Sequence, residues 1–410
     1  MKIALIMHEL LVAGGGERQC LCLARELAAQ GHQVTIYTSA HDSRNCFPQL
    51  LPGINVQVIG RGLFPWLKRP RFLRGYLDMK KMAAMVKTRH EVWNPQHWPG
   101  QWGAVWLKRK LGGVVVWMSN DVPNFHEKAR QQHAFRNLLK AIVYRLFYSY
   151  DRAQSRHIDV TVLVSKWAET EYRLVYPGMT CIVHPGMDPG QFRPGGDRAR
   201  IRDRFGYSAD EFVVLWLGII MPHRRLQDAI DAIAELRSRE LNVKLLIAGS
   251  VDAFPDYVSS LKTQVARLKL DQDISFSGRV ADQEMRDFYC ACDAFVFPNE
   301  HQTWGLAVLE AMSCGCPVLV STGAAVHEAV VDQENGLLFP ARSPIELADC
   351  ITKLIRDPAF RQSIAERGMQ SVRSRYSWEQ YAKNVLFVFR QAISSTNVDL
   401  KISRQLTAER

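Results

Sequence analysis

The 410-residue sequence lacks several patterns that would assign a protein to a class directly. Its nine cysteines are scattered, odd in number and without a C-x-x-C motif, which is typical of a reduced cytosolic protein rather than of a disulfide framework or a zinc site. No apolar run approaches the roughly 20 residues of a membrane-spanning helix. Met1 and Lys2 lead into an apolar run that is too short for a secretory signal, and no internal repeat or low-complexity tract is present. We therefore expect a globular cytoplasmic protein.

The length and the charge distribution indicate two domains with different roles. A chain of 410 residues is too long for one ordinary hydrophobic core. Residues 1–195 contain 26 Lys or Arg and 13 Asp or Glu, a net charge of +13, whereas residues 196–410 have a net charge of −2. The excess of positive charge therefore lies entirely in the first part of the chain.

Short apolar segments alternate with helical stretches in both parts. Residues 2–8 and 33–39 have the composition of strands, and three glycines at 14–16 open a helix between them that Gly31 ends. After residue 210 the pattern predicts five strands, each followed by a helical stretch, at 212–218, 243–249, 274–278, 293–299 and 317–321. This alternation predicts an α/β fold with two Rossmann-like, doubly wound parallel sheets, covered by helices on both faces.

The domain boundary is expected at residues 183–196, which are dense in Pro and Gly and lie where the charge balance changes. The N-terminal domain is then 1–185, and the C-terminal domain is 186–375. Two such domains leave a central cleft between them. In doubly wound sheets, ligands bind outside the carboxyl ends of the strands.

One carboxylate stands out in the segment that follows the strand predicted at 293–299. Leu306, Leu309 and Met312 have helical spacing and predict a buried face, and Glu310 points roughly the same way. Because a buried charge is costly unless it is paired, Glu310 either has a structural partner or contacts a ligand.

The start of this helix has the properties of an anion site. The backbone N–H groups of Trp304, Gly305 and Leu306 have no partners within the helix, and the helix dipole adds a positive potential there. Gly305 permits close approach of a ligand such as a phosphate. Glu310 lies about 7.5 Å further along the axis, about the distance from a diphosphate to its ribose. The pattern alone leaves open that Glu310 bonds only to a neighbouring backbone amide.

The segment 299–321 resembles the donor-binding signature of retaining GT-B glycosyltransferases of family 4. That signature has a Glu, then Phe-Gly-Leu or a similar triplet, then a second Glu eight residues after the first. The resemblance implies that Glu310 binds the ribose of a nucleotide sugar and that Gln302 replaces the Glu beside the transferred sugar. It also implies the GT-B fold, in which the two domains face a central cleft.

Other motifs of the family follow in order along some 380 residues. They are "GGGER" (14–18), "VLVSKWAET" (162–170), "IVHPGMDPGQFRP" (182–194), "QENGLLF" (333–339) and "YSWEQYAKNVLFVF" (376–389). In the family the final helix crosses back onto the N-terminal domain, so residues 376–410 are expected to form this helix and a tail. "NCF" (45–47) is similar to a motif of lipid-linked oligosaccharide mannosyltransferases.

Besides Gln302, further positions depart from the family pattern. Where the family has an Arg and, five residues later, a Lys on the diphosphate, this chain has Ile219 and Arg224. Arg225 or His223 could replace the lost cation; alternatively, the two arginines only cap a surface helix. Where many members have a His near the reacting sugar, this chain has Asn120, which cannot titrate.

The resemblance therefore assigns candidate roles to individual residues. The catalytic candidates are Asn120, Gln302 and Glu310. The donor-binding candidates are Gly14, Gly15, Gly16, Arg224, Arg225, Trp304, Gly305, Leu306 and Glu310. His97, Asp121 and His126 are candidates on the acceptor side, although a lone His is more often a surface or packing residue. The family mechanism is front-face attack in which the leaving phosphate assists deprotonation of the acceptor, so no residue is assigned as the base, and no metal or other cofactor is expected.

Basic residues are interleaved with aromatic and leucine residues at 61–90 and again at 134–152. The first stretch holds nine Lys or Arg and one acidic residue, a composition that suits the surface of an anionic membrane. The alternative is ordinary helices with an apolar face on the sheet and a solvated basic face. Binding to nucleic acid is disfavoured, because no nucleic-acid motif accompanies the charge.

Together these observations predict a retaining glycosyltransferase in polysaccharide biosynthesis. It would move a sugar from a nucleoside diphosphate sugar, with mannose from GDP-mannose as the first expectation, to a lipid-linked or glycan acceptor at the cytoplasmic face of a membrane. The departures at Gln302, Ile219 and Asn120 leave one alternative, a non-catalytic sugar-nucleotide-binding or scaffold protein of the same fold.

Overall fold

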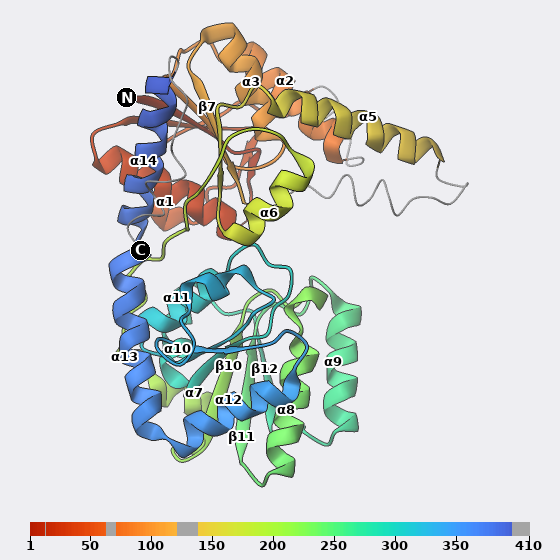
Figure 1. Ribbon diagram of the computed structural model, residues 1–410, viewed down its shortest axis with the longest axis vertical. Coiled ribbons are helices and arrows are strands. Elements are labelled where there is room, and N and C mark those ends of the chain that lie inside the picture. The colour runs from red at the N-terminus through yellow and green to blue at the C-terminus, as the bar shows by residue number, and fades with distance from the viewer. Residues whose placement is uncertain (13, 63–70, 121–137, 396–410) are drawn as a thin grey trace. The chain divides into compact units, whose positions relative to one another are not determined.

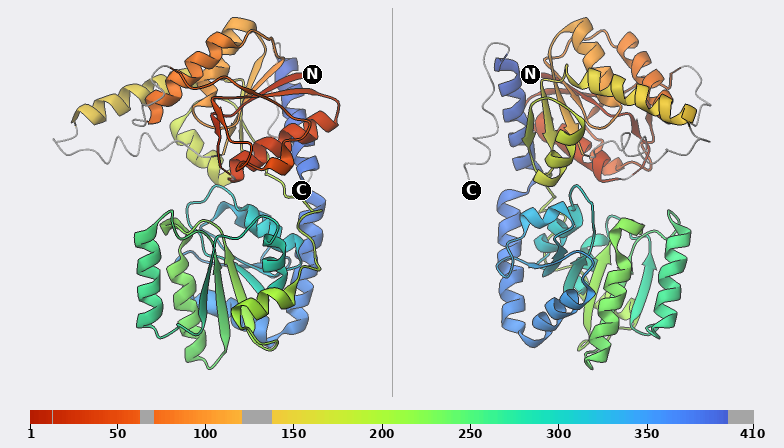
Figure 2. Two further views of the ribbon diagram at one scale, coloured as in Figure 1. Left: turned by 180° about the vertical axis from the view of Figure 1, so that it is seen from behind. Right: turned by 45° about the vertical axis from the view of Figure 1, so that its right-hand side comes forward.

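The computed structural model describes residues 1–12, 14–62, 71–120 and 138–395. The chain divides into two compact units, of which the first combines Met1–Pro185 with Trp378–Arg410 and the second is Gly186–Ser377. Each unit is built around one parallel sheet with helices on both of its faces (Figures 1 and 2). The predicted α/β class is confirmed.

The first unit contains a seven-stranded sheet in the order β5-β3-β1-β6-β7-β8-β9. Its strands are β1 (Lys2–Ile6), β3 (Gln33–Thr38), β5 (Asn55–Val58), β6 (Val92–Pro95), β7 (Val114–Ser119), β8 (Val160–Leu163) and β9 (Thr180–Ile182). β2 (Glu9–Leu10) and β4 (Ala40–His41) form a separate parallel pair. Every residue of β6, β7 and β8 is buried, as expected for parallel strands that are covered on both faces.

The helices of the first unit are α1 (Gly15–Ala29), η1 (Pro48–Leu50), α2 (Arg71–Met85), α3 (Gly100–Leu111), α5 (Leu138–Ser155), α6 (Lys166–Val175) and α14 (Trp378–Ser394). The last of these comes from the far end of the chain and packs against α1 (Figure 1). Tyr381 of α14 is fully buried, and its hydroxyl accepts a hydrogen bond from Gln19 Nε2 at 2.5 Å. Among the described helices, none is long and apolar enough to cross a membrane.

The second unit contains a six-stranded sheet in the order β12-β11-β10-β13-β14-β15. Its strands are β10 (Phe212–Leu217), β11 (Val243–Ala248), β12 (Ile274–Gly278), β13 (Ala294–Phe297), β14 (Val318–Ser321) and β15 (Leu337–Phe339). Its helices are α7 (Arg198–Phe205), η3 (Pro222–Arg224), α8 (Leu226–Ser238), α9 (Pro255–Arg267), α10 (Met285–Ala291), α11 (Leu306–Ser313), η4 (Ala325–Ala329), α12 (Pro344–Arg356) and α13 (Pro358–Arg375).

Both sheets have a point at which the strand order reverses. In the first unit the chain proceeds outward from β1 to β3 and β5, then returns to β6 on the other side of β1. In the second unit it proceeds from β10 to β11 and β12, then returns to β13 beside β10. The loops that leave the two central strands diverge there, so the carboxyl ends of β1 and β6, and of β10 and β13, are where ligands are expected to bind.

A buried carboxylate connects three elements of the first unit. Asp151 of α5 is fully buried and accepts hydrogen bonds from Gln101 Nε2 at 2.9 Å and Trp102 Nε1 at 2.6 Å, both on α3. The hydroxyl of Tyr176, directly after α6, also donates to it. Burial raises the pKa of Asp151 to about 6, and these hydrogen bonds oppose the rise.

This shift predicts a pH dependence of folding. Because the folded state favours the neutral carboxyl, the stability that Asp151 contributes is full below its ordinary pKa of 3.8 and is lost as the pH rises to about 6. The loss is on the order of 3 kcal/mol. Urea unfolding across this range should show that wild type loses stability relative to Asp151→Asn, which keeps an acceptor oxygen and does not titrate. A difference between the two proteins that is independent of pH would contradict the assignment.

Candidate functional site

Three polar side chains meet at the carboxyl edge of the second sheet. Asn299, two residues after β13, is fully buried. With its amide oriented to satisfy its neighbours, its oxygen accepts from Arg224 Nη1 at 2.8 Å and its nitrogen donates to the backbone oxygen of Arg224 at 3.2 Å. The side-chain amide of Gln302 lies 2.5 Å from that of Asn299. Asn299 thus connects the loop after β10 to Gln302.

The loop that carries Gln302 is also held by its backbone. Gln302 pairs with Ala324 in an isolated parallel bridge, and its carbonyl oxygen accepts from the N–H of Ala325 at 3.0 Å. Glu300 in the same loop forms an ion pair with Arg342, with Nη2 at 3.0 Å. Burial alone would raise the pKa of Glu300, but the hydrogen bond and charge of Arg342 outweigh it and lower the pKa. The loops that follow β13, β14 and β15 are therefore connected at the carboxyl edge of the second sheet.

Helix α11 begins directly after Gly305. A Cβ atom on Gly305 would lie 2.8 Å from Cζ of Phe297 and 3.0 Å from Cγ1 of Val326, so the position is closed to larger residues by internal packing. The ring of Trp304 is buried, with its centroid 6.1 Å from that of Tyr376. What Trp304, Gly305 and half-buried Leu306 present at the helix start is therefore mainly backbone N–H groups.

Glu310 has a structural partner that the sequence does not reveal. The residue is 4% exposed, and its Oε2 accepts a hydrogen bond from the hydroxyl of Tyr289 on α10 at 2.8 Å. Tyr289 is fully buried, with the rings of Phe192 and Phe295 at centroid distances of 6.0 and 5.6 Å. Tyr289 therefore fixes the orientation of the Glu310 carboxyl group.

The two adjacent arginines have different surroundings. Arg225 immediately precedes α8, and its guanidinium binds the carboxylate of Asp228 through Nε at 2.9 Å and Nη2 at 2.7 Å. Burial raises the pKa of Asp228, and Arg225 limits the rise. Arg225 therefore forms an ion pair within the first turn of α8, whereas Arg224 contacts Asn299. Ile219, at the position of the missing cation, is 53% exposed.

The candidates of the first unit lie at the carboxyl edge of its own sheet. Gly14, Gly15 and Gly16 open α1 after β1. His97 follows β6, and a Cβ on Gly16 would lie 2.1 Å from its Nε2, so the imidazole packs directly on this glycine. Asn120 follows β7, with its Nδ2 at 3.5 Å from the backbone oxygen of Gln96. The structure thus brings these residues to neighbouring strand ends; Asp121 and His126 lie outside the described residues.

Sequence reasoning missed a buried amide pair next to Asn120. Asn94 and Gln96 are both fully buried, Asn94 Nδ2 donates to the carbonyl of Val116 at 2.5 Å, and Gln96 Nε2 donates to Asn94 Oδ1. Gln96 Oε1 and Asn120 Oδ1 are buried and accept no hydrogen bond from the described part of the chain. Because a buried acceptor without a donor is costly, these two oxygens suit the hydroxyl groups of a ligand. The sequence does contain a signal for this amide pair, because polar residues are unusual inside and directly after a central strand.

Comparisons with known proteins identify both units. The model of Glycosyltransferase Family 4 matches residues 13–191, and that of Glycosyl transferases group 1 matches residues 197–371. The D-inositol 3-phosphate glycosyltransferase of Frankia alni is 28% identical over 408 residues, covering 94% of this chain and 96% of the relative.

Solved structures share the fold across nearly the whole chain. Sucrose-phosphate synthase from Thermosynechococcus elongatus has a TM-score of 0.78 at 21% identity, covering 96% of this chain and 99% of that one. HepE from Anabaena, in complex with UDP and glucose, has a TM-score of 0.73 at 20% identity, covering 95% of this chain and 99% of that one. The chain therefore carries a Glycosyltransferase Family 4 domain followed by a Glycosyl transferases group 1 domain, and it is a glycosyltransferase of the GT-B fold.

Proposed function

We propose that the protein is a retaining glycosyltransferase that binds a nucleoside diphosphate sugar at the carboxyl edge of its second sheet. The observation that carries this proposal is the contact of Arg224 and Gln302 with Asn299, just before α11, the helix that carries Glu310. Each part of the donor would have its own binding group. A cation and backbone N–H groups would bind the diphosphate, an amide the sugar, and a carboxylate the ribose.

The diphosphate is the leaving group, and its stabilisation is the main task of such a site. The guanidinium of Arg224 is oriented by Asn299, so its position is fixed before the donor binds. The N–H groups at the start of α11 add partial positive charge without a side chain that must reorganise. Gln302 contacts the same Asn299, so the group assigned to the sugar and the group assigned to the phosphate are held by one buried amide.

The acceptor is proposed to bind at the carboxyl edge of the first sheet. Gln96 Oε1 and Asn120 Oδ1 are acceptors suited to sugar hydroxyls, and His97 lies against the loop of Gly16. An amide cannot take up the proton of the attacking hydroxyl. In the proposed front-face reaction, the acceptor oxygen bonds to the anomeric carbon, the bond to the diphosphate breaks, and the proton passes to the leaving phosphate. In this reaction Asn120 orients a substrate and does not act as the base.

The identities of the donor and of the acceptor are separate proposals, and each needs its own test. GDP-mannose was the expectation from the sequence, whereas HepE is a UDP complex and the Frankia alni relative is named for inositol phosphate. A screen of UDP and GDP sugars for thermal stabilisation identifies the donor, and transfer to lipid-linked, glycan and inositol phosphate acceptors is then assayed with that donor. Binding without hydrolysis or transfer would favour the non-catalytic alternative.

Charge at Glu310 should be needed for donor binding. Glu310→Gln keeps the size and an acceptor for Tyr289 but removes the charge that strengthens bonds to ribose hydroxyls. We expect nucleotide affinity in calorimetry to fall about tenfold, which corresponds to about 1.4 kcal/mol. Glu366→Gln, an exposed residue of α13 that bonds to Gln362, is the matched control and should bind like wild type. Wild-type affinity in a folded Glu310→Gln protein would refute the ribose assignment.

The substitutions at Gln302 and Ile219 should be energetically coupled. A Glu at 302 would place a negative charge beside Asn299 and its partner Arg224, close to the leaving diphosphate. We expect Gln302→Glu to lower turnover, Ile219→Arg to change it little, and the double variant to recover activity, because the added cation offsets the added charge. The readout is a double-mutant cycle on turnover; additivity within about 0.5 kcal/mol would show that the positions are independent.

An anionic membrane is proposed as a further partner, through α5. Ile142 and Leu146 lie one turn apart on this helix and are 45% and 65% exposed, with Arg145 exposed between them. The basic stretch 61–90 offers less positive charge to a membrane than its composition suggests. Arg61 and Arg74 both form ion pairs with Glu9, at 3.0 and 2.7 Å. Its residues 63–70 lie outside the described chain.

Replacing both apolar residues of α5 should weaken membrane binding. Sedimentation with vesicles containing an anionic phospholipid should show a partition coefficient lower by about tenfold for Ile142→Ser/Leu146→Ser, because the apolar side chains no longer enter the interface. Raising the salt to about 0.5 M should weaken wild-type binding as well. Leu174→Ser, 70% exposed on α6, is the control. If the wild-type protein does not sediment with the vesicles at low salt, the proposal that α5 binds a membrane is wrong.

A further inference from the structure

A cavity in the first unit is lined by three aromatic side chains and two lysines. It has a volume of about 410 Å³, and its wall contains Tyr76 and Lys80 of α2, Trp106 and Lys110 of α3, and Tyr150 of α5. Helix α3 packs against both α2 and α5 (Figure 1). Small-molecule sites typically enclose about 300–1,000 Å³ within mainly apolar and aromatic walls that carry a few polar groups, so this cavity has the size and the lining of a ligand site.

The cavity lies away from the edge at which the acceptor is proposed to bind. Helices that connect parallel strands run back from the carboxyl edge of the sheet to its amino edge. Lys80 is in the second half of α2, Trp106 and Lys110 are in the second half of α3, and Tyr150 is near the end of α5. These residues therefore lie toward the amino edge, whereas the amides after β6 and β7 lie at the carboxyl edge.

The three aromatic rings are packed edge to face, not in a stack. The ring of Tyr76 lies 5.4 Å from that of Trp106 and 5.9 Å from that of Tyr150, with interplanar angles of 87° and 68°. All three residues are half-buried, so each is held by its neighbours and still exposes part of its surface. Burial raises the pKa of Tyr150 to about 12, so its hydroxyl keeps its proton at neutral pH and can donate a hydrogen bond. The wall therefore combines apolar ring surface with hydrogen-bonding atoms.

The charge at the cavity is positive. Lys80 is exposed, and its ammonium lies 6.0 Å from the centroid of the Tyr76 ring. Lys110 donates to three carbonyl oxygens at the end of α2, at 2.9, 3.1 and 3.0 Å, which fixes its ammonium group in place. None of the described residues that line the cavity is an Asp or a Glu, so these charges are not neutralised within it.

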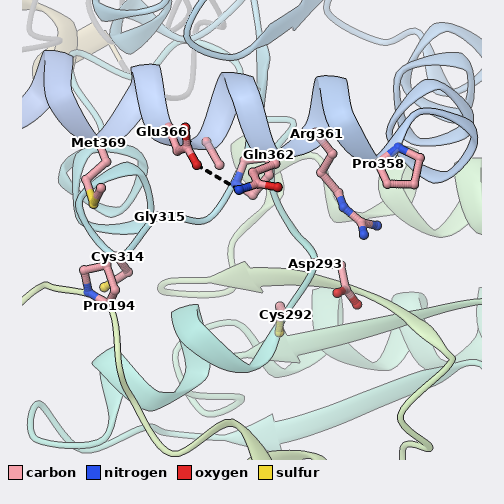
Figure 3. A pocket seen from close by; sticks show the side chains of 12 residues that line it. Pro194, Cys292, Asp293, Cys314, Gly315, Pro358, Arg361, Gln362, Glu366 and Met369 are labelled. Carbon is pink, nitrogen blue, oxygen red and sulfur yellow. Dashed lines mark hydrogen bonds between the residues drawn. The ribbon is translucent and has the colours of Figure 1, made fainter.

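A cavity of similar size in the second unit has a different charge pattern. Its volume is about 480 Å³, and its wall contains Arg361 together with the carboxyl groups of Asp293 and Glu366 (Figure 3). Asp293 pairs with Arg198 at 2.8 Å, and Glu366 accepts a hydrogen bond from Gln362 at 2.9 Å. Because these carboxylates repel an anion, of the two cavities only that of the first unit favours an anionic ligand.

We propose that the cavity between α2, α3 and α5 binds an anionic saccharide, a sugar that carries a carboxylate or a phosphate group. The aromatic surfaces contact C–H groups of the sugar ring, and the tyrosine hydroxyls and the indole N–H bond to its hydroxyl groups. Lys80 pairs with the anionic group, and the fixed charge of Lys110 attracts it as well. An acyl chain of a lipid would cover the rings but leave their polar atoms without partners, so a saccharide fits better. This site does not depend on the proposed donor site.

The proposal is tested by calorimetry on the full chain with two anionic saccharides, trigalacturonate and glucose 6-phosphate. The neutral counterparts are the methyl ester of trigalacturonate and glucose, and inorganic phosphate is the competitor that lacks a sugar. Both anionic saccharides should bind, and their neutral counterparts should bind about tenfold more weakly, because bonds to an ionised group are the stronger ones. Raising the salt to about 0.5 M should also weaken binding.

Two variants separate the charge from the rings. Lys80→Gln removes an exposed cation and should weaken binding of both anionic saccharides about fivefold. Trp106→Leu removes one ring and should weaken binding of the anionic saccharides about tenfold. The control is Lys87→Gln, which removes the same charge from an exposed lysine two residues after α2 and should bind like wild type. Because Lys80 is exposed, Lys80→Gln decides the outcome even where Trp106→Leu is unstable.

Several results would overturn the proposal. They are failure of both anionic saccharides to bind, equal binding of the neutral counterparts, wild-type affinity in Lys80→Gln, and equal losses in Lys80→Gln and Lys87→Gln. If inorganic phosphate displaces glucose 6-phosphate at equal concentration, the cavity recognises an anion and no saccharide. If Lys80→Gln weakens binding to anionic phospholipid vesicles but not to the saccharides, the cavity belongs to a membrane-binding surface and the saccharide assignment is wrong.

Discussion

The burial of one carboxyl group, that of Glu310, is the constraint that joins two helices of the second unit. A carboxylate in an apolar helix is costly unless its oxygens are hydrogen-bonded. Tyr289 supplies that bond from α10, and Phe192 and Phe295 pack around the tyrosine ring, so the hydroxyl has little freedom to turn away. The packing of α10 on α11 and the orientation of the carboxyl group meet in this contact.

The two sheets use one architecture to present two kinds of chemistry. At the reversal point of the second sheet the side chains are charged, with Arg224 and Glu310 held by Asn299 and Tyr289. Near the carboxyl ends of β6 and β7 in the first sheet lie neutral amides, with Asn94, Gln96 and Asn120 in a chain of hydrogen bonds. Fixed charges suit a diphosphate, whereas neutral acceptors suit hydroxyl groups.

The sequence predicts the fold better than it predicts the partners within the site. Strands such as β10 and β11 were predictable because parallel strands covered on both faces need continuous apolar runs. β15, with three residues inside "QENGLLF", is too short to give such a signal. The pairing of Tyr289 with Glu310 joins residues 21 positions apart on different helices, which no periodicity encodes. By contrast, the pairing of Arg225 with Asp228 has the i,i+3 spacing of a first helical turn and was open to prediction.

The edge lacks two charges that the family signature contains, and two other charges in its loops are paired within the unit. Arg225 is paired with Asp228, and Glu300 is paired with Arg342, so each of these charges is neutralised by a neighbour. Of the two adjacent arginines, Arg225 pairs with Asp228 and Arg224 contacts Asn299. A Glu at position 302 without an Arg at 219 would shift this balance toward negative charge, which repels a diphosphate. Gln302 and Ile219 are each unusual alone, but together they leave the net charge of the edge the same as in the family pattern.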